Sequence, residues 1–384
     1  MATKKKIAFY APLKSPDHPI PSGDREIARL MMKALRLAGY SVELVSDVIS
    51  YQKRPSGELY GTRKSAVSAE ENRIRRLWES DAASLPDLWF TYHPYCKSPD
   101  WLGLPLARHF KIPYVTAEAC RTRQGTANDW LEGRAAAQEA IRFAKVNFVL
   151  KDSDWQYLKT VTPDMKTAVR ITPFLDISGL PARAKPKKLF ENEAPVLLAA
   201  GMMRPGAKME SYRTLAAALQ LIENKDWNLI IAGEGPERAN IAELLRFAGS
   251  DRVKFVGSVA HEDMFALMDS SDIFVWPGIG EAIGLVYLEA QARGMPVVAL
   301  NTAGVPLVVS DGVGGTLLPV GDTGAYAAAI ARLLDDRRLR EELGAGGRRY
   351  VHEHHNVTSV AATFKSVIDG IFADASAANQ NSPQ

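Results

Sequence analysis

Residues 6–45 read KIAFYAPLKSPDHPIPSGDREIARLMMKALRLAGYSVELV. The opening residues, Lys6–Tyr10, are typical of a buried strand, and a proline-rich loop follows them. Asp24–Ala38 then repeats apolar residues at helical spacing, and Gly39 ends this helix before a second strand, Val42–Val45. A strand, a helix and a strand in this order form a βαβ unit, which predicts a parallel sheet.

The same alternation continues along most of the chain and falls into two series. The basic, proline-rich stretch Gly179–Lys188 lies between them and is typical of a linker. The 384 residues suffice for two cores, so we expect an α/β protein with two Rossmann-like, doubly wound domains, at 1–178 and 189–350, that face a central cleft. A C-terminal helix at 357–374 is expected to pack back on the first domain, and 375–384 to form a disordered tail.

Residues 51–80 interrupt this alternation with a polar stretch that is rich in arginine and glutamate. A solvated surface loop and helix would explain such a composition. An insertion that faces the acceptor and meets an anionic or carbohydrate partner would also explain it. Both interpretations stay open at this point.

Composition excludes several classes of protein. Apolar residues make up 46 % of the chain and charged residues 24 %, as in a globular rather than a disordered or fibrous protein. The net charge of +3 is too small to indicate nucleic-acid binding, and a pI near 8.7 fits either anionic small molecules or a weak preference for membrane surfaces. No apolar run reaches roughly 18 residues, and Cys96 and Cys120 are too few for a disulfide framework. We therefore expect a protein of the reducing cytoplasm, without a signal peptide.

The stretch 275–296, VWPGIGEAIGLVYLEAQARGMP, carries the most chemical information. It predicts a strand, a glycine-rich loop and a helix from about Gly284 to Ala292. Glu281 in the loop and Glu289 in the helix should lie on the order of 10 Å apart, too far to share a proton. This separation suits the two ends of an extended ligand, with the helix N-terminus between them as an anion site. A nucleotide sugar has this layout of sugar hydroxyls, diphosphate and ribose hydroxyls.

The Glu281-x7-Glu289 motif, in the setting EAIGLVYLEAQARGMPVVA, resembles the signature of glycosyltransferase family 4, the retaining GT-B enzymes also called glycosyl transferases group 1. The blocks SGDREIARLMMKALRLAGYSVELVS, LIIAGEGPER, RVKFVGSV, SSDIFVWPG and TAGVPLVVSDGVGGTLLPVGD are similar in order and spacing, so the resemblance covers nearly the whole chain. It implies that Glu289 binds the ribose hydroxyls and Glu281 the hydroxyls of the donor sugar. It also implies that the backbone N–H groups of Ile283, Gly284 and Leu285 meet the diphosphate.

Two cations, Arg204 and Lys208, follow a strand in the block AAGMMRPGAK. Cations beyond the carboxyl end of a strand are well placed to neutralise a leaving diphosphate, and the resemblance implies that role. The block departs from the family in two ways: Met202 stands where relatives usually carry arginine, and the cations are one residue closer together. Arg213, on the following helix, is a weaker substitute.

Two loop glycines are candidates for the donor site, because a residue without a Cβ lets the backbone approach a phosphate closely. Gly23 stands in Ser22-Gly23, where the family has a glycine pair, and Gly233 begins a Gly-Glu-Gly turn after a strand. The resemblance implies that both lie at the donor and that the backbone of Val259 contacts its base. A turn glycine without a ligand would also explain Gly23.

His93 follows a strand in TYHPY and is expected to point into the cleft. The resemblance implies that it orients the reacting sugar hydroxyls, and a structural histidine at a strand end is the alternative. Asp24, Arg25 and Glu118 are weaker candidates on the acceptor side. Glu118 stands where relatives carry His-Asp, and Leu307 where they often carry glutamate, so the sequence departs from the family at both positions.

Two apparent metal motifs are better explained as structure. Asp152-Ser153-Asp154 has the DxD pattern, but a helix follows at once, and we expect the aspartates to cap it. The tract His352–His355 is expected to be a polar junction between helices. We therefore expect no metal site.

These features predict a retaining, metal-independent glycosyltransferase that needs no cofactor. It would move a hexose from a UDP- or GDP-linked sugar to a hydroxyl of a glycan or lipid-linked acceptor in cell-envelope synthesis, without nucleic acid. The expected location is the cytoplasm, with peripheral contact at the inner face of the membrane. A sugar-nucleotide epimerase on a similar fold, a catalytically inert sugar-nucleotide-binding module and a nicotinamide dehydrogenase are the alternatives.

Overall fold

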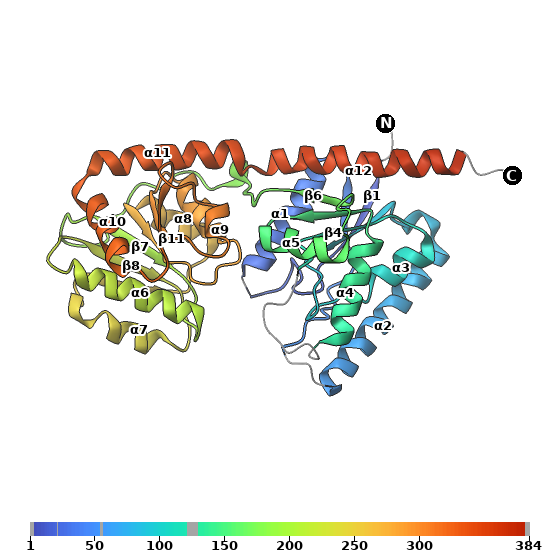
Figure 1. The fold of residues 1–384 in the computed structure, drawn as a ribbon, viewed down its shortest axis with the longest axis horizontal. Coiled ribbons are helices and arrows are strands. Elements are labelled where there is room, and N and C mark those ends of the chain that lie inside the picture. The colour runs from blue at the N-terminus through green and yellow to red at the C-terminus, as the bar shows by residue number, and fades with distance from the viewer. Residues whose placement is uncertain (1–3, 21, 54–56, 121–129, 381–384) are drawn as a thin grey trace. The chain divides into compact units, whose positions relative to one another are not determined.

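The chain divides into two compact units (Figure 1). The computed structural model describes residues 4–20, 22–53, 57–120 and 130–380. The first unit consists of Met1–Thr172 together with Val357–Gln384, and the second of Pro173–Asn356.

Parallel strands form the sheet of the first unit, in the order β2-β1-β3-β4-β5-β6. The central strands are continuous apolar runs and are buried, as expected for a parallel sheet with helices on both faces. Because β1 has β2 on one side and β3 on the other, the strand order reverses there. The strands are β1 (Lys6–Tyr10), β2 (Ser41–Leu44), β3 (Leu88–Tyr92), β4 (Tyr114–Ala117), β5 (Val146–Val149) and β6 (Ala168–Arg170); the helices are α1 (Gly23–Leu37), α2 (Gly57–Ser80), α3 (Gly103–Phe110), α4 (Leu131–Phe143), α5 (Asp152–Val161) and α12 (Val357–Gln380).

The second unit has its own parallel sheet, in the order β12-β11-β10-β7-β8-β9. This is the Rossmann order, with the reversal between β7 and β10. The strands are β7 (Val196–Ala200), β8 (Asn228–Ala232), β9 (Val253–Gly257), β10 (Ile273–Val275), β11 (Val297–Leu300) and β12 (Gly315–Leu318); the helices are α6 (Ala207–Leu221), α7 (Arg238–Leu244), α8 (His261–Asp269), α9 (Leu285–Ala292), α10 (Thr323–Asp335) and α11 (Arg337–His354).

The polar stretch 51–80 is the crossover between β2 and β3. Its helix α2 buries an apolar stripe, Val67, Ile74 and Trp78, in the same core as Trp89 of the sheet. The charged residues lie on the other side of α2 and pair along the helix, as Arg73 does with Glu70. The stretch is therefore a helix with a solvated face, as the first interpretation has it, and the buried stripe makes it part of the first unit's core.

The proline-rich segment after Thr172 packs on the second unit. The backbone N–H groups of Ala184 and Lys187 donate to Asp269 Oδ2 and Ser270 Oγ, at 2.8 and 3.0 Å. These contacts explain why the second unit begins at Pro173, before the linker that the sequence indicates.

The last helix, α12, belongs to the first unit and lies along α1 (Figure 1). Tyr40 fixes this packing, because its hydroxyl lies 2.8 Å from Asp369 Oδ1 and its ring meets Phe372 edge to face. The helix continues to Gln380, past Ala375, where the sequence predicts a disordered tail. The alanines of this stretch, ADASAANQ, favour helix. Residues 381–384 lie outside the described residues.

Candidate functional site

The candidate donor site lies at the carboxyl ends of β7 and β10, where the strand order of the second unit reverses. Open α/β sheets bind ligands at such a reversal, because the two loops there turn away from each other. The loop after β7 carries Arg204 and leads to Lys208, at the start of α6. The loop after β10 carries Glu281 and leads into α9.

Lys208 and Glu281, from these two loops, meet directly. The Lys208 ammonium contacts Glu281 Oε1, and the indole Nε1 of Trp276 donates to the same oxygen at 3.2 Å. The ammonium also lies 5.5 Å from the centre of the Trp276 ring. Both side chains keep partial exposure, 25 % for Lys208 and 17 % for Glu281. The structure thus brings together two residues that the sequence assigns to one donor.

Arg204 and Arg213 differ in their surroundings. Arg204 is exposed in the loop before α6, and among the described residues its guanidinium has no ion pair or side-chain hydrogen bond. Arg213 is exposed on α6 and pairs with Glu210 Oε2 at 3.3 Å. The face of α6 that meets the β10 loop is a different one: Ser211 Oγ accepts from the Ile279 N–H at 3.0 Å. Arg204 is therefore the better placed of the two arginines to reach a ligand beside Lys208.

Helix α9 begins at Leu285, directly after its N-cap residue Gly284. Gly284 has a φ of 82°, in the left-handed region that favours glycine, and no side chain in the described part of the chain caps this N-terminus. The first N–H groups of a helix lack partners within it and attract anions. Ile283, directly before this turn, is buried, and the Tyr287 hydroxyl donates to the Trp276 carbonyl at 3.0 Å. The loop that presents these N–H groups is therefore held from both sides.

A close approach of two backbones fixes the position of Glu281. The Gly304 N–H donates to the Glu281 carbonyl at 2.9 Å. A Cβ on Gly304 would lie 1.9 Å from the Ala282 carbonyl oxygen, so this position accepts only glycine. Leu307 follows in a short 3-10 turn, Val305–Leu307.

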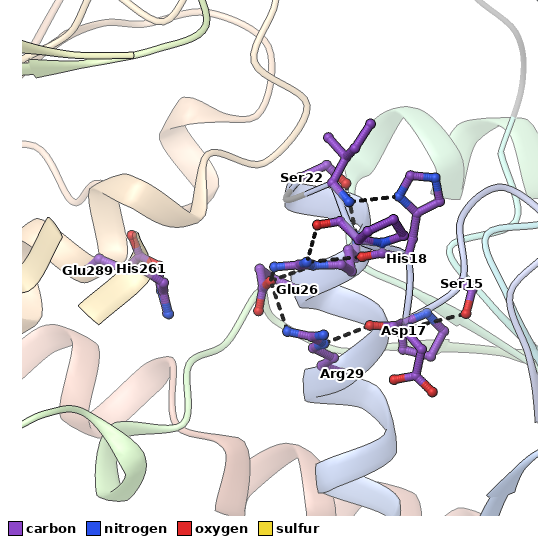
Figure 2. A network of polar contacts seen from close by, with 12 residues as sticks. Ser15, Asp17, His18, Ser22, Glu26, Arg29, His261 and Glu289 are labelled. Carbon is purple, nitrogen blue, oxygen red and sulfur yellow. Dashed lines mark hydrogen bonds and ion pairs between the residues drawn. The ribbon is translucent and has the colours of Figure 1, made fainter. Parts of the chain in front are cut away.

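Glu289 is nearly buried on α9, with 8 % of the residue exposed. His261, the first residue of α8, holds it, with Nε2 2.9 Å from Glu289 Oε1 (Figure 2). Val259 lies two residues before His261, so this contact draws the Val259 loop toward Glu289. Sequence reasoning missed His261; the only available signal was a histidine at a helix start, after the block RVKFVGSV.

The turn Gly233-Glu234-Gly235 has a structural reason for its glycines. Gly233 has a φ of 146°, and a Cβ there would lie 2.0 Å from the Gly201 carbonyl oxygen. A Cβ on Gly235 would lie 2.2 Å from the Met203 carbonyl oxygen. The turn thus packs the end of β8 against the loop that carries Arg204, and packing alone explains the glycines.

In the first unit, His93 and Asp24 lie together at the carboxyl end of β3. His93 has a φ of 58°, with Nδ1 3.5 Å from Asp24 Oδ1 and Nε2 3.3 Å from Cys120 Sγ. Burial alone would lower the pKa of His93, but Cys120, Glu118 and Asp24 outweigh it and raise this pKa well above its usual value. The site therefore favours a protonated imidazole.

Glu118 is a buried member of an ion-pair network. It is 2 % exposed, its Oε1 contacts the Lys151 ammonium, and its Oε2 accepts from the Tyr92 hydroxyl at 3.0 Å. Burial alone would raise the pKa of Glu118, but Lys151 and His93 lower it below its usual value. Lys151 also lies 3.2 Å from Asp154 Oδ2. Sequence reasoning missed Lys151, because it is 33 residues from Glu118.

The aspartates of the DxD pattern do not cap α5, contrary to expectation. The N-cap residue is Lys151, without a side-chain cap bond, and both aspartates lie in the first turn. Asp152 pairs with Arg170 at 2.6 Å and Asp154 with Lys151. A negative charge in the first turn still suits the helix dipole.

The donor-site candidate Gly23 and the weaker acceptor-side candidate Arg25 lie at the start of α1. Ser22 Oγ accepts from the Arg25 N–H at 3.3 Å, and the Arg25 guanidinium holds the preceding loop by donating to the His18 carbonyl at 3.0 Å. The Arg25 side chain is 12 % exposed and also pairs with Glu26. A Cβ on Gly23 would meet nothing within 4 Å, so packing does not explain this glycine.

The histidine tract ends α11. His355 is buried, and its Nδ1 lies 2.6 Å from the Pro173 carbonyl oxygen, which joins the first and last segments of the second unit. Within the described ranges, no group of three or more His, Cys, Asp or Glu side chains could hold a metal ion. In those same ranges, no helix has the length and apolar character to cross a membrane.

Comparison with known proteins agrees with this geometry. Residues 194–336 match the family model described as Glycosyl transferases group 1. The chain has the GT-B fold, and the segment that matches this family model lies in its second unit. That domain contains Arg204, Lys208, Glu281 and Glu289.

Curated relatives match this chain over part of their length. Alpha-D-kanosaminyltransferase of Streptomyces kanamyceticus is 33 % identical over 153 residues, or 40 % of this chain and 39 % of the relative. GDP-mannose-dependent alpha-(1-6)-phosphatidylinositol monomannoside mannosyltransferase of Mycobacterium tuberculosis is 31 % identical over 200 residues, or 49 % and 51 %. The alignments with the first relatives thus span between two fifths and a half of those proteins.

Solved structures match the whole GT-B fold. Sucrose-phosphate synthase from Thermosynechococcus elongatus superposes with a TM-score of 0.73 at 22 % identity, over 97 % of this chain and all of that one. Anabaena HepE in complex with UDP superposes with a TM-score of 0.68 at 16 % identity, over 95 % of this chain and all of that one.

Proposed function

We propose that this protein transfers a hexose from a UDP- or GDP-linked sugar to a hydroxyl of a glycan or lipid-linked acceptor, with retention at the anomeric carbon. The observation that carries the proposal is the contact of Lys208 with Glu281 beside the open N-terminus of α9. It puts a cation, unpaired N–H groups and a carboxylate within reach of one ligand. The GDP-mannose dependence named for one relative and the UDP bound in one structural neighbour support this choice of donor.

Each group would act on a different part of the donor. The N–H groups at the start of α9 bind the diphosphate, and Lys208 and Arg204 offset the charge that grows as the leaving group departs. A diphosphate that draws Lys208 away frees the Glu281 carboxylate to accept hydroxyl donors from the sugar. Glu289, held by His261, accepts from the ribose hydroxyls.

The reaction would need neither metal nor cofactor, since protein groups neutralise the diphosphate. On the acceptor side, a protonated His93 can donate to a hydroxyl of the reacting sugar. Glu118 acts at a distance, because its charge favours that protonation while it stays paired with Lys151. The proposal keeps the sequence-based expectation of a cytoplasmic enzyme that meets a lipid-linked acceptor at the inner membrane face.

A thermal-unfolding panel with UDP-, GDP- and ADP-sugars tests the donor. A ligand present at about 100 times its dissociation constant should add about 2.7 kcal/mol to the free energy of unfolding. The stabilising donor is then incubated with and without extracted bacterial glycolipid, and sugar transfer and diphosphate release are measured. Transfer supports the proposal. Stabilisation by NAD alone, an epimerised sugar from donor alone, or binding without turnover would instead indicate a dehydrogenase, an epimerase or an inert binding module.

A further inference from the structure

A second polar pocket lies at the opposite edge of the second unit's sheet. Pro195, Asp272 and Pro296 line it, and each directly precedes a strand, so the pocket is at the amino ends of β7, β10 and β11. The candidate donor site is at the carboxyl ends of the same sheet. The pocket has a volume of about 620 Å³, the size of a small-molecule site. No residue of the donor site lines it.

Arg293 is the unusual residue of this pocket. Its side chain is 6 % exposed, yet among the described residues its Nε and Nη2 have no hydrogen-bond partner. Asp269 is the carboxylate paired with it, but its Oδ1 lies 3.7 Å from Nε, beyond hydrogen-bond distance, and its Oδ2 accepts from the Ala184 N–H. Buried donors without an acceptor are costly, and Arg293 is one of the residues that line the pocket.

Two of the other arginines that line the pocket, Arg183 and Arg340, donate hydrogen bonds to backbone carbonyls. Arg183 Nη2 contacts the Arg293 carbonyl, and Arg340 Nη1 donates to the carbonyls of Leu333 and Leu334, at 2.5 and 3.0 Å. Backbone carbonyls accept hydrogen bonds but carry no formal charge. These two guanidiniums are therefore without an opposing carboxylate among the contacts that the structure records.

Most of the carboxylates at the pocket are already engaged. Glu341 pairs with Arg337 at 2.9 Å and Glu193 with Lys188 at 2.8 Å. Asp272 Oδ2 accepts from the Val196 N–H at 2.8 Å, and this carboxylate alone faces no cation in the recorded contacts. Four arginines and four carboxylates line the pocket, and because Glu193 pairs with Lys188 outside this lining, one guanidinium charge is left over. Burial, together with the nearby Arg183 and Arg348, lowers the pKa of Arg293 despite Asp269. A bound anion would stabilise the charged form of Arg293.

We propose that this pocket binds a small phosphorylated ligand, with its phosphate held by Arg293, Arg183 and Arg340. Arginine forks suit phosphate oxygens in number and geometry, and a phosphate would supply the anionic acceptors that these guanidiniums lack. Arg293 is also the C-cap residue of α9, the helix that carries Glu289 and begins at the donor loop. A phosphate bound here therefore acts on the far end of a helix of the donor site.

Isothermal titration of the full chain with glycerol 3-phosphate and with inorganic phosphate tests the site, with glycerol as the blank. Arg183→Gln and Arg340→Gln should each weaken binding by about tenfold, the value of one charge-assisted bond. Arg338→Gln, a charge change on the same helix but outside the pocket, should leave binding unchanged. Lys208→Gln separates this pocket from the donor site and should also leave it unchanged.

The comparison of probes identifies the source of the phosphate. Tighter binding of the ester indicates an esterified ligand, and tighter binding of the free ion indicates phosphate itself; both support the site. Absence of binding to the wild-type chain would overturn the proposal, as would loss of binding only in Lys208→Gln, or wild-type affinity in both Arg183→Gln and Arg340→Gln. These outcomes do not depend on glycosyl transfer, so the pocket and the proposed function can fail separately.

Discussion

His261 Nε2 lies 2.9 Å from Glu289 Oε1, and this contact joins the start of α8 to the middle of α9. A nearly buried carboxylate at a donor site is thereby held in one orientation by a partner that is 54 % exposed. Glu289 is therefore a hydrogen-bond acceptor in a fixed position, and His261 is exposed enough to contact a ligand.

Glu289→Gln should weaken donor binding and lower turnover while the chain stays folded. The amide keeps an oxygen that can accept from His261, but the negative charge that accepts two ribose hydroxyls is lost. The donor dissociation constant and the thermal midpoint are measured together. Glu262→Gln, an exposed carboxylate in the first turn of α8, is the matched control. Unchanged donor affinity and turnover in Glu289→Gln would remove Glu289 from the site.

Arg204→Ala and Lys208→Ala should each raise the barrier of transfer by about 2–4 kcal/mol, or about 30- to 1,000-fold in rate. Turnover should suffer more than donor affinity, because the cations offset charge that grows in the transition state. The double variant should cost less than the sum, since both cations serve one diphosphate. Steady-state kinetics measures these effects.

Arg213→Ala is the control for the two cations, and its rate should stay near that of the wild type because Arg213 pairs with Glu210 on the surface. If Arg213→Ala abolished transfer while Arg204→Ala did not, the assignment of the arginine would be wrong. If neither arginine nor Lys208 mattered, the account of the leaving group would fail.

Transfer should persist in EDTA. The proposal assigns diphosphate neutralisation to Arg204, Lys208 and the start of α9, whereas Asp152 and Asp154 already pair with Arg170 and Lys151. The rate is measured in EDTA and again after addition of Mn²⁺ or Mg²⁺. Loss of activity in EDTA with rescue by either ion would contradict the metal-independent mechanism.

Lys151→Met should destabilise the chain by about 3–5 kcal/mol, because it leaves the Glu118 carboxylate buried without its cation. The double variant Lys151→Met/Glu118→Gln should regain most of this loss. Urea unfolding measures both, with Lys166→Met as the exposed control, since Lys166 is 83 % exposed. A similar loss in the single and double variants would show that the charge is not the cause.

The free energy of unfolding of the same variants should depend on pH in a direction that the pKa of Glu118 determines. The folded pKa of Glu118 is lowered, so its contribution to the free energy of unfolding is present above its usual value of 4.5 and is lost as pH falls through the folded pKa. The difference in stability between the wild type and the double variant should therefore shrink in acid.

Sequence patterns predicted two α/β units with parallel sheets, because parallel strands covered on both faces are apolar runs with helices between them, and the family resemblance predicted the GT-B fold. Strand β12, in GGTLLPVGD, was not anticipated, because a short run after two glycines resembles a loop. The buried stripe of α2 was not anticipated for a related reason: its residues Val67, Ile74 and Trp78 are widely spaced among many charges.

Those residues of the candidate site that belong to a sequence motif could be predicted. The residues that join the site only through tertiary contacts could not. Glu281, Glu289 and Lys208 stand in recognisable blocks, although Lys208 and Glu281 meet across 73 residues. His261 and Lys151 belong to no motif, and their partners lie 28 and 33 residues away. Only the fold reveals such pairs, because sequence spacing carries no information about which loops share a sheet edge.

Tyr40 and Asp369 are 329 residues apart in sequence, and their hydrogen bond helps to hold α12 against α1. A ribosome that has released the first 172 residues has therefore not yet supplied all of the first unit. The second unit, contiguous from Pro173 to Asn356, can complete its core before the segment that closes its predecessor has left the exit tunnel. The first unit therefore completes its fold last, and until residues 357–380 have left the tunnel the face of α1 that receives α12 stays exposed to nascent-chain chaperones.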